Sequence, residues 1–172
     1  MKKKESGINR IVFSVLVFIV QLIICNYVHI SPLVGIYLLP LIIFCLPLNW
    51  RPVSVMVISF GLGLLLDLLS GGLLGLNAGA AVFAAALRKF SYRVSVSRDR
   101  QDKTIFATPR TVGAVKFYAF LSCGTVLYTA ACVALDCITF RSGTFILAKF
   151  ALSSLVSLAV SFIISFSFLN RE

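Results

Sequence analysis

Three ionisable side chains lie within or beside long apolar stretches of the sequence: Asp67, Asp136 and Lys149. An ionisable residue inside a membrane span is costly to bury and marks a functional site by default. Two aspartates could share a proton in general acid–base chemistry, as in an aspartyl intramembrane protease. However, no second motif frames Asp136, and the serine-hydrolase, zinc-protease and phosphate-loop motifs do not occur. We therefore expect no enzyme and no catalytic residue.

The role of Lys149 has two interpretations. A lysine near the end of a span can extend its aliphatic stem and place its ammonium group at the membrane surface. In that case Asp67 and Asp136 only mark the ends of helices. Alternatively, Lys149 pairs with Asp67 or Asp136 inside the bundle, near its outer face.

Metal, cofactor and disulfide chemistry lack the residues they need. The single histidine, His29, has no second histidine to join it as a metal ligand. The five cysteines include no Cys-x-x-Cys pair, and an odd number cannot all pair. We expect no metal site and no cofactor, and we interpret the cysteines as small packing residues: Cys25, Cys45, Cys123, Cys132 and Cys137.

The densest pattern of small residues lies between residues 61 and 79. Gly71, Gly75 and Gly79 recur every four residues and would share one face of a helix. Small residues at this spacing let two membrane helices approach closely. Gly71 and Gly72 would also permit a tight reversal beside Asp67, on the external side. The pattern predicts helix packing first, and a turn that a partner could recognise second.

Composition assigns the whole chain to one structural class. Of its 172 residues, 59% are hydrophobic and 13% are charged. A soluble domain has about 45–50% apolar and about 25% charged residues, and it could not hide this excess. We therefore predict an all-α integral membrane protein with a single polytopic domain over residues 1–172.

Apolar runs long enough to cross a bilayer give the expected spans, since a membrane helix needs about 20 such residues. Pro40 should kink the second span by removing a backbone hydrogen bond. The basic segment 88–116 is expected to be a cytoplasmic linker that binds anionic lipid or a cytoplasmic protein. Six spans are expected: 11–30, 33–48, 53–70, 72–87, 117–135 and 144–169.

The positions of the basic residues predict the orientation. With both termini in the cytoplasm, 14 of the 16 lysines and arginines fall on the cytoplasmic side, as the positive-inside rule requires. Within the first span, Gln21 and Asn26 are polar. We expect both side chains to point inward, where each can hydrogen-bond another helix.

Six residues carry a resemblance to a known family: four at intervals of four residues (Gly63, Asp67, Gly71 and Gly75), with Gln21 and Pro40 in the first two spans. In this pattern, and in size and number of spans, the chain resembles the rod shape-determining protein MreD family of the bacterial inner membrane. It departs from the family in Asn77 and in the length of the 88–116 linker.

The resemblance implies a non-enzymatic scaffold that maintains rod shape by organising peptidoglycan synthesis along the side wall. The implied partners are an MreC-like bitopic membrane protein and, through it, an MreB-like cytoskeletal protein and the cell-wall synthases. The implied fold is similar to the substrate-binding membrane component of energy-coupling-factor transporters. A second hypothesis is therefore a small-molecule-binding transporter component, whose polar pocket would be lined by Asp67, Asn77, Asp136 and Lys149.

Overall fold

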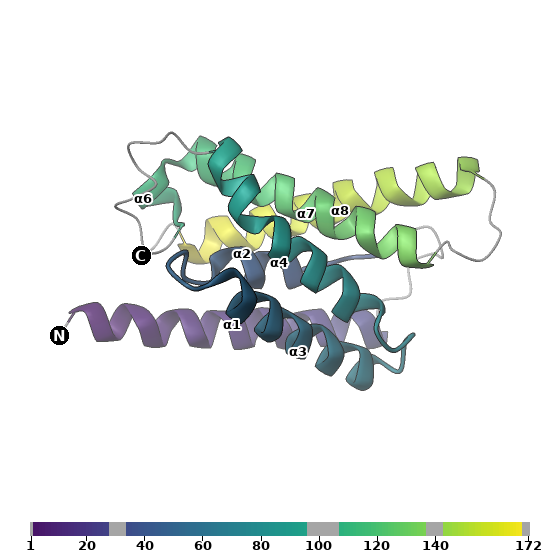
Figure 1. Cartoon of the computed structure of the whole chain (residues 1–172), viewed down its shortest axis with the longest axis horizontal. Coiled ribbons are helices and arrows are strands. Elements are labelled where there is room, and N and C mark those ends of the chain that lie inside the picture. The colour runs from purple at the N-terminus through teal and green to yellow at the C-terminus, as the bar shows by residue number, and fades with distance from the viewer. Residues whose placement is uncertain (1, 28–33, 96–106, 137–142, 170–172) are drawn as a thin grey trace.

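The computed structural model describes residues 2–27, 34–95, 107–136 and 143–169. Every regular element in these ranges is a helix, as the sequence predicts (Figure 1). The helices are α1 (Lys2–Tyr27), α2 (Leu39–Cys45), α3 (Pro52–Ser70), α4 (Leu76–Ser95), α6 (Pro109–Val112), α7 (Ala114–Asp136) and α8 (Gly143–Leu169).

Three of these helices are long and apolar enough to cross a bilayer: Pro52–Ser70, Ala114–Asp136 and Gly143–Ser167. A shorter apolar helix covers Ile11–Tyr27 within α1. Many large hydrophobic side chains face outward, including Val57 on α3 and Leu155 on α8, each 65% exposed. Helices that satisfy their own backbone hydrogen bonds while presenting apolar side chains suit a lipid environment. The coarse prediction of a helical membrane protein is thus supported.

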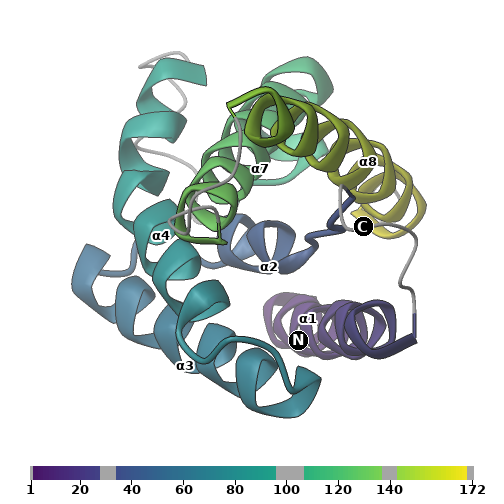
Figure 2. The same cartoon turned by 90° about the vertical axis from the view of Figure 1, so that its right-hand side faces the viewer.

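The molecule has two distinct ends. Helix α1 begins and α8 finishes at one of them, which we call the terminal end (Figure 1). The turn between α3 and α4, the last turn of α7 and the first turn of α8 lie at the opposite end, which we call the hairpin end. Viewed from the hairpin end, α3 and α8 lie on opposite sides of the molecule (Figure 2).

The second expected span is not a kinked helix, and the prediction for residues 33–48 is wrong. Residues 34–38 are non-helical, and α2 then makes only two turns before Leu46. Pro40 lies in the first turn of α2. A proline there costs no hydrogen bond, because the first N–H groups of a helix have no intrahelical acceptor. Pro40 therefore starts a helix instead of bending one.

The fourth span and the basic linker also have different bounds from those expected. Helix α4 begins at Leu76, not at residue 72, and continues to Ser95. It therefore includes the first eight residues of the segment that the sequence assigned to a linker. The end of that segment is helical as well, in α6 and the start of α7. Charge alone did not end α4, because these basic and aromatic residues are compatible with a helix and part of them is buried.

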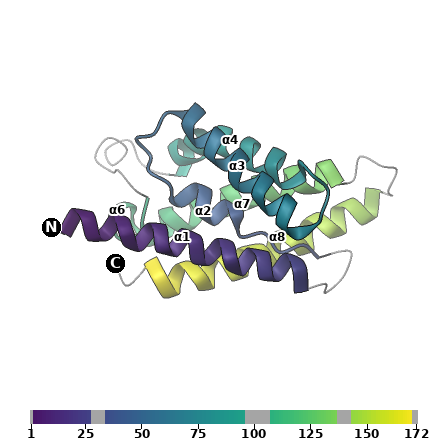
Figure 3. The ribbon, with the colours of Figure 1, turned by 90° about the horizontal axis from the view of Figure 1, so that it is seen from below.

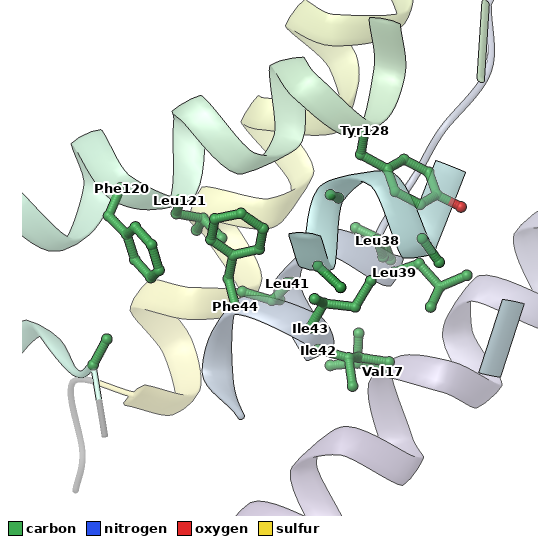
Figure 4. Close-up of a cluster of buried hydrophobic side chains, with 14 of the residues drawn as sticks. Val17, Leu38, Leu39, Leu41, Ile42, Ile43, Phe44, Phe120, Leu121 and Tyr128 are labelled. Atoms are coloured by element: carbon green, nitrogen blue, oxygen red, sulfur yellow. The ribbon is translucent and has the colours of Figure 1, made fainter. Parts of the chain in front are cut away.

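Short helix α2 lies at the centre of the molecule. Its residues Leu39 to Phe44 are all buried, and Figure 4 shows them between Val17 of α1 and the side chains of Phe120 and Leu121 on α7. The Phe44 and Phe120 rings pack with centroids 4.7 Å apart. The non-helical residues 34–37 before it are partly buried and Leu38 is buried, so their inward-facing backbone groups need protein partners.

Candidate functional site

Asp67, in the last turn of α3, is the most heavily hydrogen-bonded carboxylate of the described residues. Its side chain is 1% exposed. Oδ2 accepts from the backbone N–H groups of Gly75 (2.9 Å) and Ala78 (3.2 Å). Oδ1 accepts from the backbone N–H of Asn77 (3.2 Å) and from its side-chain Nδ2 (2.8 Å). Asp67 therefore caps the N-terminus of α4 from the preceding helix.

Four donors explain why a buried carboxylate is stable here. An ionised carboxylate offers about four acceptor positions, and an unmet charge in an apolar interior is very costly. The first N–H groups of a helix lack intrahelical acceptors and carry a partial positive charge. Asp67 and the start of α4 therefore satisfy each other, and these hydrogen bonds leave few lone pairs for a ligand.

The glycines of the predicted motif build the same hairpin. Gly71 ends α3 with a φ of 63°, and Gly75 has a φ of 93°, both in the left-handed region that favours glycine. A Cβ at Gly63 would lie 2.5 Å from the Cα of Ala78, so only glycine permits this approach of α3 to α4. Each motif residue thus has a physical role in one hairpin: Gly63 allows close approach and Asp67 caps α4. Gly71 and Gly75 adopt the positive φ angles of the turn.

The predicted helix face of Gly71, Gly75 and Gly79 does not exist. Gly71 and Gly75 lie in the turn, and only Gly79 is helical, because α4 begins at Leu76. Gly79 is exposed, with the side chain of Leu135 as its neighbour. Most of the small residues that α4 buries are alanines, which pack inside the molecule: Ala78, Ala80, Ala81, Ala84 and Ala85.

Asn77 connects the capped hairpin to α7. Its Oδ1 accepts a hydrogen bond from the hydroxyl of Tyr128 (2.9 Å), which is fully buried on α7. The Tyr128 ring in turn packs against Tyr37, with centroids 5.6 Å apart. Sequence reasoning missed Tyr128, although a tyrosine in the middle of an apolar span needs a partner for its hydroxyl.

Gln21 faces inward, as predicted, and bonds the non-helical segment 34–38. The side chain is fully buried. Its Nε2 donates to the carbonyl of Ile36 (3.1 Å), and its Oε1 accepts from the N–H of Leu38 (2.6 Å). Irregular backbone at membrane depth is tolerated only when protein groups satisfy it. Gln21 supplies two of those groups from α1.

Serines of α8 satisfy the opposite edge of the same segment. The N–H of Gly35 donates to Ser153 Oγ and that of Tyr37 to Ser157 Oγ, each over 2.9 Å. Two residues of extended chain rise about 6.6 Å, and four residues of helix rise about 6 Å, so the two spacings match. Sequence reasoning missed this ladder, although its serines recur every four residues and are all fully buried: Ser153, Ser157, Ser161 and Ser165.

Lys149 forms an ion pair with Asp136, not with Asp67. The side chains are 12% and 30% exposed respectively, so the pair lies at the edge of the protein. Asp136 is the last residue of α7, where the helix dipole disfavours a negative charge. The ammonium group of Lys149 offsets this and joins α8 to α7 at the hairpin end. The structure therefore has one of the two pairings considered, in place of an unpaired surface lysine.

Asn26 does not point inward, so that part of the prediction is wrong, but it does hydrogen-bond another helix as expected. The residue is exposed at the end of α1, and its Nδ2 donates to the backbone carbonyl of Leu69 (3.4 Å). Carbonyls in the last turn of a helix have no intrahelical donor, so an outward amide can satisfy one. The bond joins α1 to α3 at the hairpin end.

Arg88 is a buried residue of α4, not a residue of a cytoplasmic linker. It is 3% exposed, and its guanidinium donates to the carbonyls of Leu46 and Pro47, the latter over 3.3 Å. A cation at the C-terminal end of a helix is favourable, and here it follows α2. Sequence reasoning counted Arg88 only as a topology charge, because nothing in its neighbourhood in the sequence shows that α2 ends beside it.

The polar residues expected to line a transporter-like pocket are hydrogen-bonded in two separate groups, Asp67 with Asn77 and Asp136 with Lys149. Two cavities lie elsewhere and have mainly apolar walls, one between α1 and α3 and one between the start of α7 and the end of α8. The described residues contain no cluster of three potential metal ligands. His29 and Cys137 lie outside the described residues.

Comparisons with protein-family models, curated proteins and solved structures found no match to this chain.

Proposed function

We propose that this chain is a multi-pass protein of the bacterial inner membrane that acts as a non-enzymatic scaffold of the cell-elongation machinery. In this proposal it crosses the membrane with both termini in the cytoplasm. It binds an MreC-like bitopic membrane protein and, through that protein, an MreB-like cytoskeletal protein and the cell-wall synthases. The support comes from the resemblance at residues 63–75 and from the apolar helices of the fold.

One observation carries the proposal: the motif residues cooperate in a single hairpin of α3 and α4. Asp67 caps α4, Gly63 allows close approach, and Gly71 shapes the turn. These contacts are all internal, so the motif organises a surface and does not bind a ligand directly.

The outward face of α3 is the surface that we propose for the partner helix. Val57, Gly61 and Leu68 are spaced by four and seven residues, and so share one face. Val57 and Leu68 are 65% and 61% exposed, and a Cβ at Gly61 would meet no atom within 4 Å. A small residue between larger apolar ones allows another membrane helix to approach closely.

Co-purification with the MreC-like protein encoded in the same genome tests this function. Gly61→Leu and Leu68→Trp should each reduce the recovered complex by about tenfold, equivalent to roughly 1.4 kcal/mol of packing. Leu155→Trp is the matched control, because Leu155 is 65% exposed on α8, on the opposite side of the molecule.

The possible results test the α3 surface and the scaffold role separately. Recovery of the full complex with both α3 variants would show that the partner binds elsewhere. Absence of any complex with the wild-type chain, in membranes where both proteins accumulate, would refute the scaffold itself.

A further inference from the structure

A slot between α1 and α3 opens at the terminal end. The two helices are close at the hairpin end and diverge toward the terminal end, with α2 between them (Figure 3). The resulting cavity measures about 530 Å³. Its walls include Ser14 and Phe18 of α1, Cys45 of α2 and Leu62 of α3. The slot exists because α2 is only seven residues long and ends at Cys45.

The slot is closed toward the hairpin end. There, Asn26 Nδ2 donates to the carbonyl of Leu69 and so joins α1 to α3. Leu46 and Pro47, which follow α2, also line the slot, and Arg88 holds them in place by donating to their carbonyls. Trp50, which is 41% exposed, lines the slot directly after the residues that Arg88 holds in place.

The length of the slot limits what can occupy it. The longest stretch of helix that lines the slot runs from Ile11 to Phe18 on α1, which is seven residues, or about 10 Å of helix. One leaflet of the hydrocarbon core is about 15 Å thick, whereas a spanning helix needs about 30 Å. The slot therefore fits a chain that enters one leaflet from the terminal end, and it is too short for a second spanning helix.

The chemistry of the opening indicates the head group of that chain. Trp50 lines the opening, and tryptophan is enriched at the level of lipid head groups. Arg51 follows it directly and is exposed. The carbonyls of Leu46 and Pro47 are occupied by Arg88, so their negative charge is compensated. The slot thus has an apolar interior and an interfacial aromatic ring, and the exposed Arg51 is the next residue in the chain.

We infer that this slot binds one acyl chain of an anionic phospholipid, with the phosphate of the lipid next to Arg51. This inference rests on the membrane character of the chain and not on the proposed scaffold role, so either can fail without the other. A bound lipid would fill the space beside α2 and tie α1 to α3 in the leaflet at the terminal end.

Trp50 is the only tryptophan of the chain, so its fluorescence reports on the slot directly. The purified full chain would be reconstituted in vesicles that contain lipids with brominated acyl chains, which quench tryptophan. Brominated phosphatidylglycerol would be compared with brominated phosphatidylcholine at equal mole fractions. The expected result is a roughly fivefold higher relative affinity for the anionic lipid, the effect of one arginine near the surface.

Two matched pairs of variants test the parts of the site. Arg51→Gln should bring the relative affinity close to one, whereas Lys89→Gln, at another exposed basic residue, should leave it unchanged. Ser14→Phe fills the slot and should reduce quenching by both lipids. Ile19→Phe is the control on the same helix, because Ile19 is 50% exposed and does not line the slot.

The inference would be overturned by equal relative affinities of the wild-type chain for the two lipids. It would also be overturned if Arg51→Gln and Lys89→Gln gave the same selectivity as the wild type. A Ser14→Phe protein that folds, as judged by its circular dichroism, and is quenched like the wild type would place the acyl chain outside the slot. If that variant does not fold, the arginine pair still decides the outcome.

Discussion

Two regions of this molecule solve the same problem in different ways. In the α3–α4 hairpin, the unpaired N–H groups at the start of a helix are satisfied by the charged side chain of Asp67, 8 to 11 residues away in the chain. In segment 34–38, neutral side chains from α1 and α8 bond the backbone. The serines of α8, Ser153 and Ser157, are 118 and 120 residues away in the chain from the N–H groups that they accept from. A local solution leaves a compact motif in the sequence, whereas a remote one leaves polar residues whose partner segment the sequence does not identify.

The largest effect should come from the hairpin. Asp67→Ala leaves three backbone N–H groups and the amide of Asn77 without their acceptor, and should lower the free energy of unfolding by about 3–5 kcal/mol. Thermal unfolding in detergent, followed by circular dichroism, measures this loss. Asp67→Asn keeps the shape and one acceptor oxygen, and should fall between the wild type and Asp67→Ala. A loss below 1 kcal/mol for Asp67→Ala would show that the cap is dispensable.

Gln21→Leu should have the next largest effect. The change leaves the carbonyl of Ile36 and the N–H of Leu38 buried without Gln21, at a cost of about 2–3 kcal/mol by the same thermal measurement. Asn26→Leu is the control on the same helix, and should cost less than about 0.5 kcal/mol because Asn26 is exposed. Equal losses for the two variants would contradict the role given to Gln21.

The serines of α8 provide an internally matched comparison. The double variant Ser153→Ala with Ser157→Ala removes three hydrogen bonds to segment 34–38, two accepted from N–H groups and one donated by Ser157 to the carbonyl of Gly35, and should cost about 1–2 kcal/mol. The double variant Ser161→Ala with Ser165→Ala has the same chemistry and spacing. Neither of these hydroxyls has a hydrogen-bond partner among the described residues. The second double variant should therefore cost nothing or stabilise the protein slightly.

Chemical denaturation of the two double variants measures the difference between them directly. If Ser161 and Ser165 proved as costly to remove as Ser153 and Ser157, the serine ladder would matter through packing and not through its bonds to segment 34–38.

The smallest effect should come from the ion pair at the edge of the hairpin end. Lys149→Met should lower the free energy of unfolding by about 1 kcal/mol, because both partners are partly exposed and solvent screens their attraction. Lys149→Arg keeps the charge and should restore most of the stability. A double-mutant cycle with Asp136→Asn isolates the coupling, and a coupling energy of zero would mean that Lys149 acts only through its aliphatic stem.

Composition and spacing along the chain were sufficient for the helical membrane character, and also for the inward position of Gln21. They also located the α3–α4 turn, since Asp67 and its donors are close in sequence and the glycines mark left-handed positions. The same reasoning failed where it assumed that a repeat of four always means a helix face. Gly71 and Gly75 recur at that interval in a turn, where each is required by its own φ angle.

Tertiary structure alone decided the path of residues 34–45 and the place of Arg88. A run of apolar residues around Pro40 is compatible with a kinked span. Its first part, residues 34–38, is non-helical instead, and Gln21 and the α8 serines supply hydrogen bonds to that backbone. Arg88 would be a surface charge if the carbonyls after α2 were not beside it. In both cases the partner is at least 15 residues away in the chain, so the energy that selects the conformation appears only when the helices pack together.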